Sequence, residues 1–212
     1  MENINIEYFD INSASDQFRT AYDIYIKSIP AGEKRSSIDL KLNLIKDGEK
    51  LTGGKLDNKI VMMGLVWHVI DSEFLFLDSL AVDENYRNKG IGTDFIKKIF
   101  SLFGDTCNKI IFETKPSNDD PDSSENKKIN FFTKLGAKKL TGFKYHVPSK
   151  ILGKPPEERI LMVISKNNDA TMEGPLIRDI LNKIYHHIYH QNYESNALSG
   201  VLNDIPRQIK LE

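Results

Sequence analysis

Cysteine is almost absent from this sequence, and neither sign of charge predominates. Cys107 is the only cysteine of the 212 residues, so an intramolecular disulfide and a cysteine-based zinc site are both excluded. The 29 Lys and Arg side chains nearly cancel the 30 Asp and Glu side chains, leaving a net charge of −1. Because proteins that bind a nucleic acid backbone normally carry a basic excess, this balance argues against that class.

Long apolar runs are also missing. No stretch approaches the roughly 20 apolar residues that a membrane-spanning helix needs. Residues 1–4 lack the basic and apolar segments that begin a signal peptide. We therefore expect a cytoplasmic protein that binds neither a membrane nor a nucleic acid.

What the sequence does contain is the pattern of a mixed α and β domain. Two amphipathic helical segments precede residue 48, and an antiparallel meander of strands follows over residues 50–82. Apolar residues at helical spacing predict a helix from Gly90 to about Phe103, and shorter strands and a helix follow up to residue 165. We predict an α+β fold for a domain over residues 1–166.

The C-terminal segment, residues 167–212, is expected to lie outside that domain. Residues 167–174 are predicted to be a linker, followed by a helix over about 175–189 with Pro175 in its first turn. The last twenty or so residues are expected to be weakly ordered. This extra helix makes a homodimer contact one possible role for the segment.

The turn before the central helix carries the clearest chemistry. Its sequence is Arg87-Asn88-Lys89-Gly90-Ile91-Gly92. A helix N-terminus presents free backbone N–H groups and the positive end of the helix dipole. Glycines there let an anion approach the main chain without obstruction by Cβ atoms. Since Arg87 and Lys89 add positive charge, the turn is predicted to bind a pyrophosphate.

Two other anion-binding turns do not fit this sequence. A P-loop ends in Gly-Lys-Ser/Thr, whereas Gly92 is followed by Thr93-Asp94. A dinucleotide-binding fingerprint needs Gly or Ala where Phe95 stands, and it opens a βαβ unit rather than following a meander.

Two segments of the sequence resemble the GNAT superfamily of N-acyltransferases. The run from Leu80 to Gly92 looks like the principal motif of that family, and Phe131-Phe132-Thr133-Lys134-Leu135-Gly136-Ala137 looks like its second motif. The resemblance covers about residues 4–165. It implies a mostly antiparallel, twisted central sheet of about six to seven strands flanked by helices, with the C-terminal helix as an addition.

The resemblance also implies acetyl-CoA as the cosubstrate and no metal. Backbone N–H groups of the turn would hold the pyrophosphate, and the main chain of the preceding strand would bind the pantetheine and polarise the thioester carbonyl. The residues implied to bind the coenzyme are Leu80, Ala81, Val82, Arg87, Asn88, Lys89, Gly90, Ile91, Gly92, Thr93, Asn126 and Phe132.

The implied reaction needs a group that removes a proton from the attacking amine, because an alkyl ammonium titrates near pH 10. Carboxylates usually serve in this family, and the candidates are Glu113, Asp78 and, less favoured, Glu33. Phe132 occupies the position of a tyrosine that is proposed elsewhere in the family to protonate the leaving thiolate. Tyr145 is the best substitute, unless the thiolate leaves unaided.

The sequence thus predicts an acetyl-CoA-dependent N-acetyltransferase that acts on a primary amine of a small molecule or peptide by direct attack in a ternary complex. The alternative is a catalytically weak or inactive module that binds acyl-CoA, an interpretation prompted by Phe132. His186 and His190 share a helical face, but the isoleucines around them favour a docking helix over a metal site.

Overall fold

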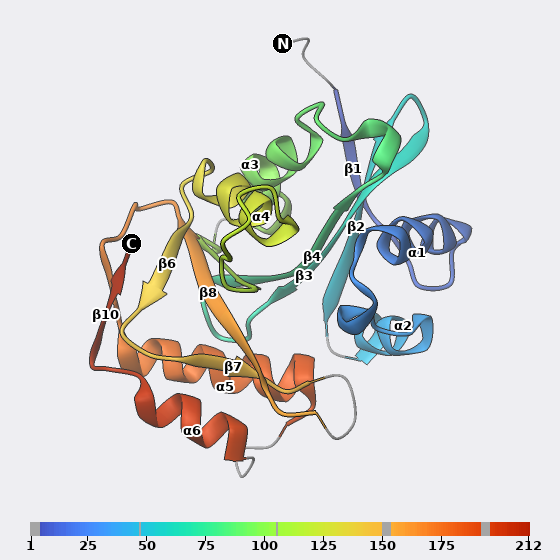
Figure 1. The fold of residues 1–212 in the computed structure, drawn as a ribbon. Helices are drawn as coiled ribbons and strands as arrows, with labels where there is room; N and C mark the ends of the chain where they lie inside the picture. Colours follow the sequence, from blue (N-terminus) through green and yellow to red (C-terminus); the bar gives the residue numbers. More distant parts are fainter. Residues whose placement is uncertain (1–4, 47, 105, 150–153, 192–195) are drawn as a thin grey trace. The chain divides into compact units, whose positions relative to one another are not determined.

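Contacts divide the chain into two compact units, which are described separately below (Figure 1). The first comprises Met1–His68 and Leu77–Asp105, and the second comprises Val69–Phe76 and Thr106–Glu212. Strand β4, Phe74–Val82, contributes to both units. The computed structural model describes residues 5–46, 48–104, 106–149, 154–191 and 196–212.

The first unit is an antiparallel meander with helices before and after it. Strand β1 pairs with β2, and β2 pairs with β3 along eight residue pairs, from Glu49 opposite Trp67 to Leu56 opposite Lys59. The elements are β1 (Glu7–Asp10), α1 (Asp16–Ser28), the 3-10 turn η1 (Ala31–Glu33), α2 (Ser37–Lys46), β2 (Glu49–Leu56), β3 (Lys59–His68), the C-terminal part of β4, the 3-10 turn η2 (Glu84–Tyr86) and α3 (Ile91–Phe103).

Helix α3 is held tightly against the strands of the first unit. A Cβ atom on Gly64 of β3 would lie 2.7 Å from the ring of Phe95, so only glycine allows α3 to approach this closely. The hydroxyl of Tyr8 on β1 donates a hydrogen bond of 2.8 Å to Asp94 in the first turn of α3. These contacts fix the N-terminal end of the helix, where the predicted anion site lies.

The second unit contains the remaining strands in the order β4-β5-β8-β6-β10-β9, with β7 paired to β8. Strand β5 runs parallel to the start of β4, with Phe74–Phe76 opposite Lys109–Ile111, and antiparallel to β8. The elements are β5 (Lys109–Thr114), α4 (Ser124–Thr133), β6 (Lys138–Thr141), β7 (Tyr145–Val147), β8 (Glu157–Ser165), β9 (Thr171–Glu173), α5 (Gly174–Tyr189), α6 (Asn196–Asp204) and β10 (Gln208–Leu211).

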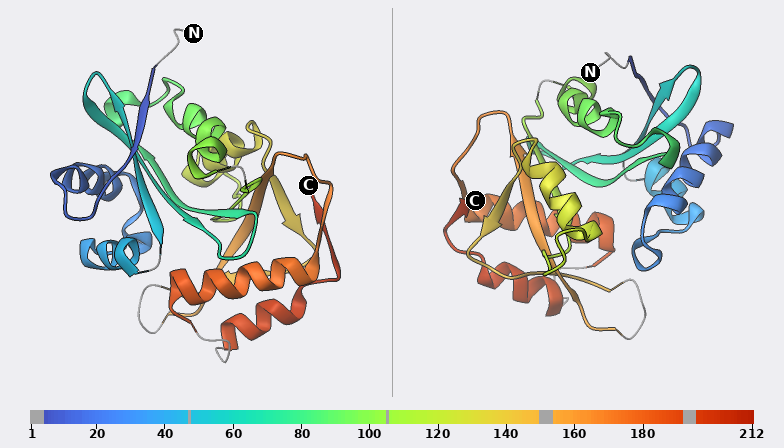
Figure 2. Two further views of the ribbon diagram at one scale, coloured as in Figure 1. Left: turned by 180° about the vertical axis from the view of Figure 1, so that it is seen from behind. Right: turned by 45° about the horizontal axis from the view of Figure 1, so that its top comes forward.

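The C-terminal segment differs from the expected helix and weakly ordered tail. Strand β10 pairs with both β6 and β9, and helices α5 and α6 run side by side (Figure 2). Gly174 starts α5 where a Cβ atom would lie 1.8 Å from the carbonyl oxygen of Pro206, so the two chain segments pack backbone to backbone. Residues 196–212 are therefore part of the sheet unit, and the prediction of a weakly ordered tail was wrong.

The predicted mixed α and β class is confirmed. Ten strands are present in the described part of the chain, more than the six to seven expected, and two of the additional strands, β9 and β10, come from the segment thought to lack strands. The apolar face of α5 is buried within the second unit, with Ile177, Ile180, Leu181 and Ile184 fully covered. That face packs inside its own chain, so the helix needs no second copy to cover it.

Candidate functional site

The turn after β4 adopts a backbone conformation suited to binding an anion. Asp83 begins it, accepting a hydrogen bond of 3.0 Å from the backbone N–H of Asn85. Asn88 and Gly90 both have left-handed conformations, with φ of 60° and 81°. Alternation of left-handed residues with neighbours of ordinary φ turns successive N–H groups toward one side, which creates a concave anion site. A Cβ atom at Gly90 would meet no protein atom within 4 Å, so the space beside this main chain is open.

The N-terminus of α3 adds donors to the same turn. The first hydrogen bond at the helix start runs from Asp94 N to Gly90 O, at 2.9 Å. The N–H groups of Ile91, Gly92 and Thr93 therefore precede the first N–H that donates within the helix, and the positive end of the helix dipole lies among them. These N–H groups are available to an anion, and the binding of a pyrophosphate here stays a prediction.

The two cations of the turn are placed differently from one another. The Arg87 guanidinium donates to Val82 O at 3.1 Å and to Ser28 Oγ at 3.2 Å, so it braces the end of β4 against the end of α1. The Lys89 ammonium lies 5.0 Å from the centre of the Tyr86 ring. In this arrangement Arg87 shapes the turn, and a direct contact between Arg87 and the coenzyme stays a prediction.

Asp78, the carboxylate candidate on β4, belongs to a buried charge cluster in the first unit. The Arg35 guanidinium lies 2.8 Å from Asp78 Oδ2 and 2.8 Å from Glu49 Oε1, with only 8% of its side chain exposed. Burial lowers the pKa of Arg35, but the charges of Asp78 and Glu49 outweigh it, and the net pKa is raised. Asp78 also accepts from Ser79 Oγ at 3.0 Å. Arg35 was not predicted from the sequence, and its single positive charge neutralises one of the two carboxylates.

Glu113, near the end of β5, lies in a cluster of tyrosines in the second unit. The hydroxyl of Tyr145 on β7 donates to its Oε1, and the hydroxyl of Tyr189 at the end of α5 donates to its Oε2. Burial, followed by the charge of Glu113, raises the pKa of Tyr145 well above 10. The structure thus brings together Glu113 and Tyr145, both predicted from the sequence, and adds Tyr189, which was not.

Four further predicted residues lie in the first unit. Glu33 lies in η1 and is half-buried, and Leu80, Ala81 and Val82 lie in the part of β4 that belongs to the first unit. None of these positions by itself decides a role.

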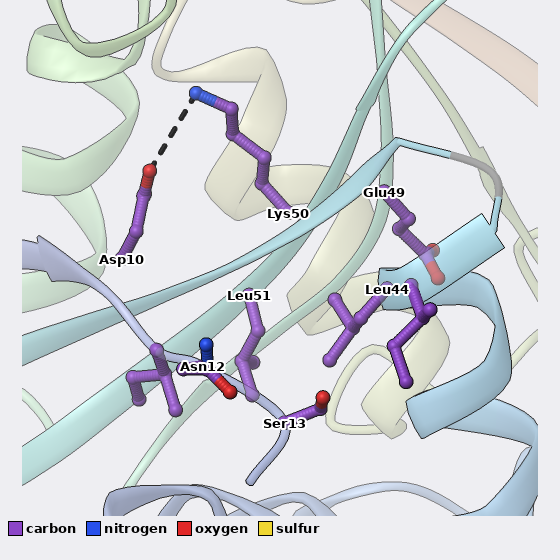
Figure 3. Close-up of a pocket in the computed structure, with 9 residues that line it drawn as sticks. Asp10, Asn12, Ser13, Leu44, Glu49, Lys50 and Leu51 are labelled. Carbon is purple, nitrogen blue, oxygen red and sulfur yellow. Dashed lines mark ion pairs between the residues drawn. The ribbon is translucent and has the colours of Figure 1, made fainter. Parts of the chain in front are cut away.

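A groove of about 310 Å³ lies in the first unit between the end of β1, the end of α2 and the start of β2 (Figure 3). Its rim carries Lys50 and Asp10, whose side chains point toward one another at 3.5 Å, and Glu49, which is bound to Arg35. The groove contains no residue of the anion-binding turn. Because these charges are paired within the protein, the groove has no evident charge preference for a ligand.

Comparison with known proteins identifies the family of the chain. The sequence profile of the acetyltransferase (GNAT) family matches residues 18–137, more than half of the chain. The chain belongs to the GNAT acetyltransferase family. No curated protein sequence matches this GNAT chain significantly.

Solved structures share the GNAT fold at low sequence identity. A GNAT-family protein from Bacteroides thetaiotaomicron described as a putative acetyltransferase has a TM-score of 0.71 at 19% identity, over 88% of this chain and 99% of that one. The ribosomal-protein-S18-alanine N-acetyltransferase of Escherichia coli has a TM-score of 0.57 at 15% identity, over 76% and 94%. A GNAT acetyltransferase from Elizabethkingia anophelis with acetyl-CoA bound has a TM-score of 0.53 at 19% identity, over 76% and 98%.

Two of the predicted coenzyme-binding residues, both on α4, make contacts within the protein. Phe132 is buried on α4, and its ring centre lies 4.1 Å from that of Phe112, so it fills the core. The Asn126 side chain donates at 2.7 Å to both Asn118 O and Asp120 O, which holds the loop before α4 in place. Their roles toward the coenzyme stay predictions.

Two features are absent from the described ranges of this GNAT chain. No group of three or more His, Cys, Asp and Glu side chains there is arranged to hold a metal ion. Within the same ranges, no helix is both long and apolar enough to cross a membrane.

Alkaline titration should show that buried tyrosine hydroxyls of this GNAT chain ionise at a higher pH than free tyrosine. Burial raises the pKa of Tyr25 to about 12, and it raises the pKa of Tyr8, Tyr145 and Tyr185 as well. In the unfolded chain each tyrosine ionises near pH 10. At about pH 11 these tyrosines therefore hold fewer protons in the unfolded chain than in the folded one. The stability that their neutral hydroxyls contribute below pH 10 is lost as the pH rises through the pKa values of the folded state.

Tyrosinate absorbance at about pH 11, with and without urea, measures this difference. We expect fewer tyrosines to ionise in the native protein than in urea, where all eight ionise. Complete ionisation of the native protein at that pH, with its circular dichroism unchanged, would contradict the burial of these hydroxyls.

Proposed function

We propose that this chain is an acetyl-CoA-dependent N-acetyltransferase that acetylates a primary amine of a small molecule or peptide. The observation that carries the proposal is the turn at Asn88 and Gly90, whose left-handed residues and helix N-terminus are suited to a pyrophosphate. The acetyl-CoA bound to the Elizabethkingia neighbour and the amine acetylation named for the Escherichia coli neighbour support it.

The proposed reaction is a single displacement in a ternary complex. The amine nitrogen attacks the thioester carbonyl carbon, the C–S bond breaks, and the coenzyme leaves as a thiolate. A backbone N–H of Leu80, Ala81 or Val82 would polarise the carbonyl oxygen, as the resemblance implies. The proton that the amine loses goes to a carboxylate.

Glu113 is the proposed proton acceptor. Asp78 is less suited because its Oδ2 is bound by the Arg35 guanidinium, which would resist the loss of that negative charge. Glu33 is the third candidate.

Tyr145 is a weak acid for the leaving thiolate in this state, because its pKa is raised above 10 and a thiol titrates near 8.5. We therefore propose that the thiolate leaves without a proton from Tyr145.

Calorimetric titration with acetyl-CoA, followed by thiol release across a panel of amines and peptides, tests the proposal. Cys107, the only cysteine, is fully buried, and burial raises the pKa of its thiol, so a thiol reagent will detect released coenzyme above a low protein background. Absence of acetyl-CoA binding would refute the proposal. Tight binding without transfer to any amine would favour a coenzyme-binding module.

Three matched variants then separate the candidate bases. Glu113→Gln is expected to lower kcat about 100-fold or more with unchanged acetyl-CoA affinity, because it removes the proton acceptor and keeps the side-chain shape. Asp78→Asn and Glu33→Gln are the controls and should retain more activity. A larger loss of kcat in either control than in Glu113→Gln would transfer the role of base to that residue.

A further inference from the structure

The last turn of α5 reaches the carboxylate that we propose as the base. Helix α5, Gly174–Tyr189, lies beyond residues 18–137, the segment that matches the family profile. Its final residue, Tyr189, is half-exposed and donates its hydroxyl to Glu113 Oε2. The contact joins residues 76 positions apart and belongs entirely to the second unit.

Each oxygen of the Glu113 carboxylate accepts from a different phenol. Tyr145 on β7 bonds Oε1, and Tyr189 on α5 bonds Oε2. The ring of Tyr185 lies between these two tyrosines in contact distance, with centres 6.2 Å from Tyr145 and 5.5 Å from Tyr189. Because two separate elements hold the two oxygens, the carboxylate has one orientation fixed at both ends.

Two other hydrogen bonds near Glu113 involve atoms outside its carboxylate. The Lys128 ammonium on α4 donates at 3.2 Å to the main-chain oxygen of Glu113. The hydroxyl of Tyr185 donates to the carbonyl oxygen of His146 on β7. Across the ladder, β8 places the apolar Leu161 opposite Glu113. Tyr185 is thus a neighbour on the same helix whose hydroxyl has another acceptor.

We propose that Tyr189 is a positioning residue for Glu113, so that helix α5 completes the proton-accepting group of the enzyme. The effect of Tyr189 on acetyl transfer rests on the proposed function, whereas the hydrogen bond between Tyr189 and Glu113 does not. A hydrogen bond donated to a carboxylate favours its ionised form, which is the form that accepts a proton. Tyr189 therefore orients Glu113 and favours its ionised form, and because the phenol is neutral it opposes proton uptake less than the Arg35 guanidinium does at Asp78.

Tyr189→Phe removes the hydroxyl and keeps the ring, and Tyr185→Phe is the matched control. The carboxyl carbon of Glu113 can be followed by NMR in protein labelled at the glutamate side-chain carboxyl, with Glu113→Gln identifying the resonance. In Tyr189→Phe the titration of Glu113 is expected to move about one pH unit upward. In Tyr185→Phe it should stay where it is in the wild type. An unmoved titration in Tyr189→Phe overturns the inference, whatever the enzyme does.

The pH–rate profile of acetyl transfer, measured with acetyl-CoA and an amine accepted in the panel, tests the catalytic consequence. Tyr189→Phe should move the acidic limb of kcat upward by the same amount and lower kcat about tenfold, with the KM for acetyl-CoA unchanged. An unmoved limb beside a moved NMR titration overturns the catalytic part of the inference. If the titration moves but the wild type acetylates no amine, the positioning of Glu113 is supported and the proposed function alone fails.

Discussion

Replacing Gly90 and Gly92 with aspartate is expected to weaken acetyl-CoA binding about 100-fold or more while the protein stays folded. Each new carboxylate would stand beside N–H groups that are proposed to bind the pyrophosphate, adding repulsion and occupying donors. The fold should tolerate both changes. Aspartate adopts left-handed conformations more readily than most residues, and negative charge is favourable at a helix N-terminus.

Lys97→Glu is the matched control for this double variant. Lys97 is exposed farther along the same helix, α3, and the substitution changes the net charge of the protein by the same amount. Calorimetric titration should give the control nearly the affinity of the wild type. If the double variant bound acetyl-CoA as tightly as Lys97→Glu, the turn would not be the pyrophosphate site and the proposed function would lose its main support.

Arg35→Met is expected to reduce the free energy of unfolding by about 3–5 kcal/mol. The substitution keeps much of the apolar volume of the side chain but removes the positive charge between Glu49 and Asp78. Glu49 has no exposed side-chain surface and Asp78 has 12%, so two carboxylates would be left buried together. Trp67, the only tryptophan, is buried on β3 of the same unit, and its fluorescence during urea unfolding reports the change.

Two further variants make this measurement specific to the buried cluster. Lys50→Met removes a lysine whose ion pair with Asp10 is about half exposed, and it should change stability by no more than about 0.5 kcal/mol. Adding Glu49→Gln and Asp78→Asn to Arg35→Met should restore most of the lost stability, because no buried charge would then lack compensation. Equal losses in Arg35→Met and Lys50→Met would show that the cluster contributes little.

Features encoded by neighbouring residues were predicted well from the sequence. The meander predicted over residues 50–82 turns at Asp57 and Asn58, where a hairpin needs two consecutive left-handed residues, and both have positive φ in the structure. The turn at Asn88 and Gly90 likewise depends on local backbone preferences. Such features lie within a few residues of one another, so the chain carries their signal in one place.

Features that depend on distant residues were not predicted. Arg35 and Asp78 are 43 positions apart, and nothing in the helical pattern around Arg35 indicates that its charge is buried beside β4. Tyr189 was predicted to lie on the last helix, but its contact with Glu113 follows from how α5 packs. Strand β10 has only four residues, so the alternation of Ile209 and Leu211 was too short to distinguish a strand from a tail.

The place of β10 between β6 and β9 has a consequence for how the protein is made. As the nascent chain leaves the ribosome, β5, β6 and β8 emerge before the strand that joins β6 to β9. The sheet of the second unit is therefore complete only after residues 208–211 have left the ribosome. We expect ribosome-bound chains that stop before β10 to be more sensitive to protease in this unit than released chains.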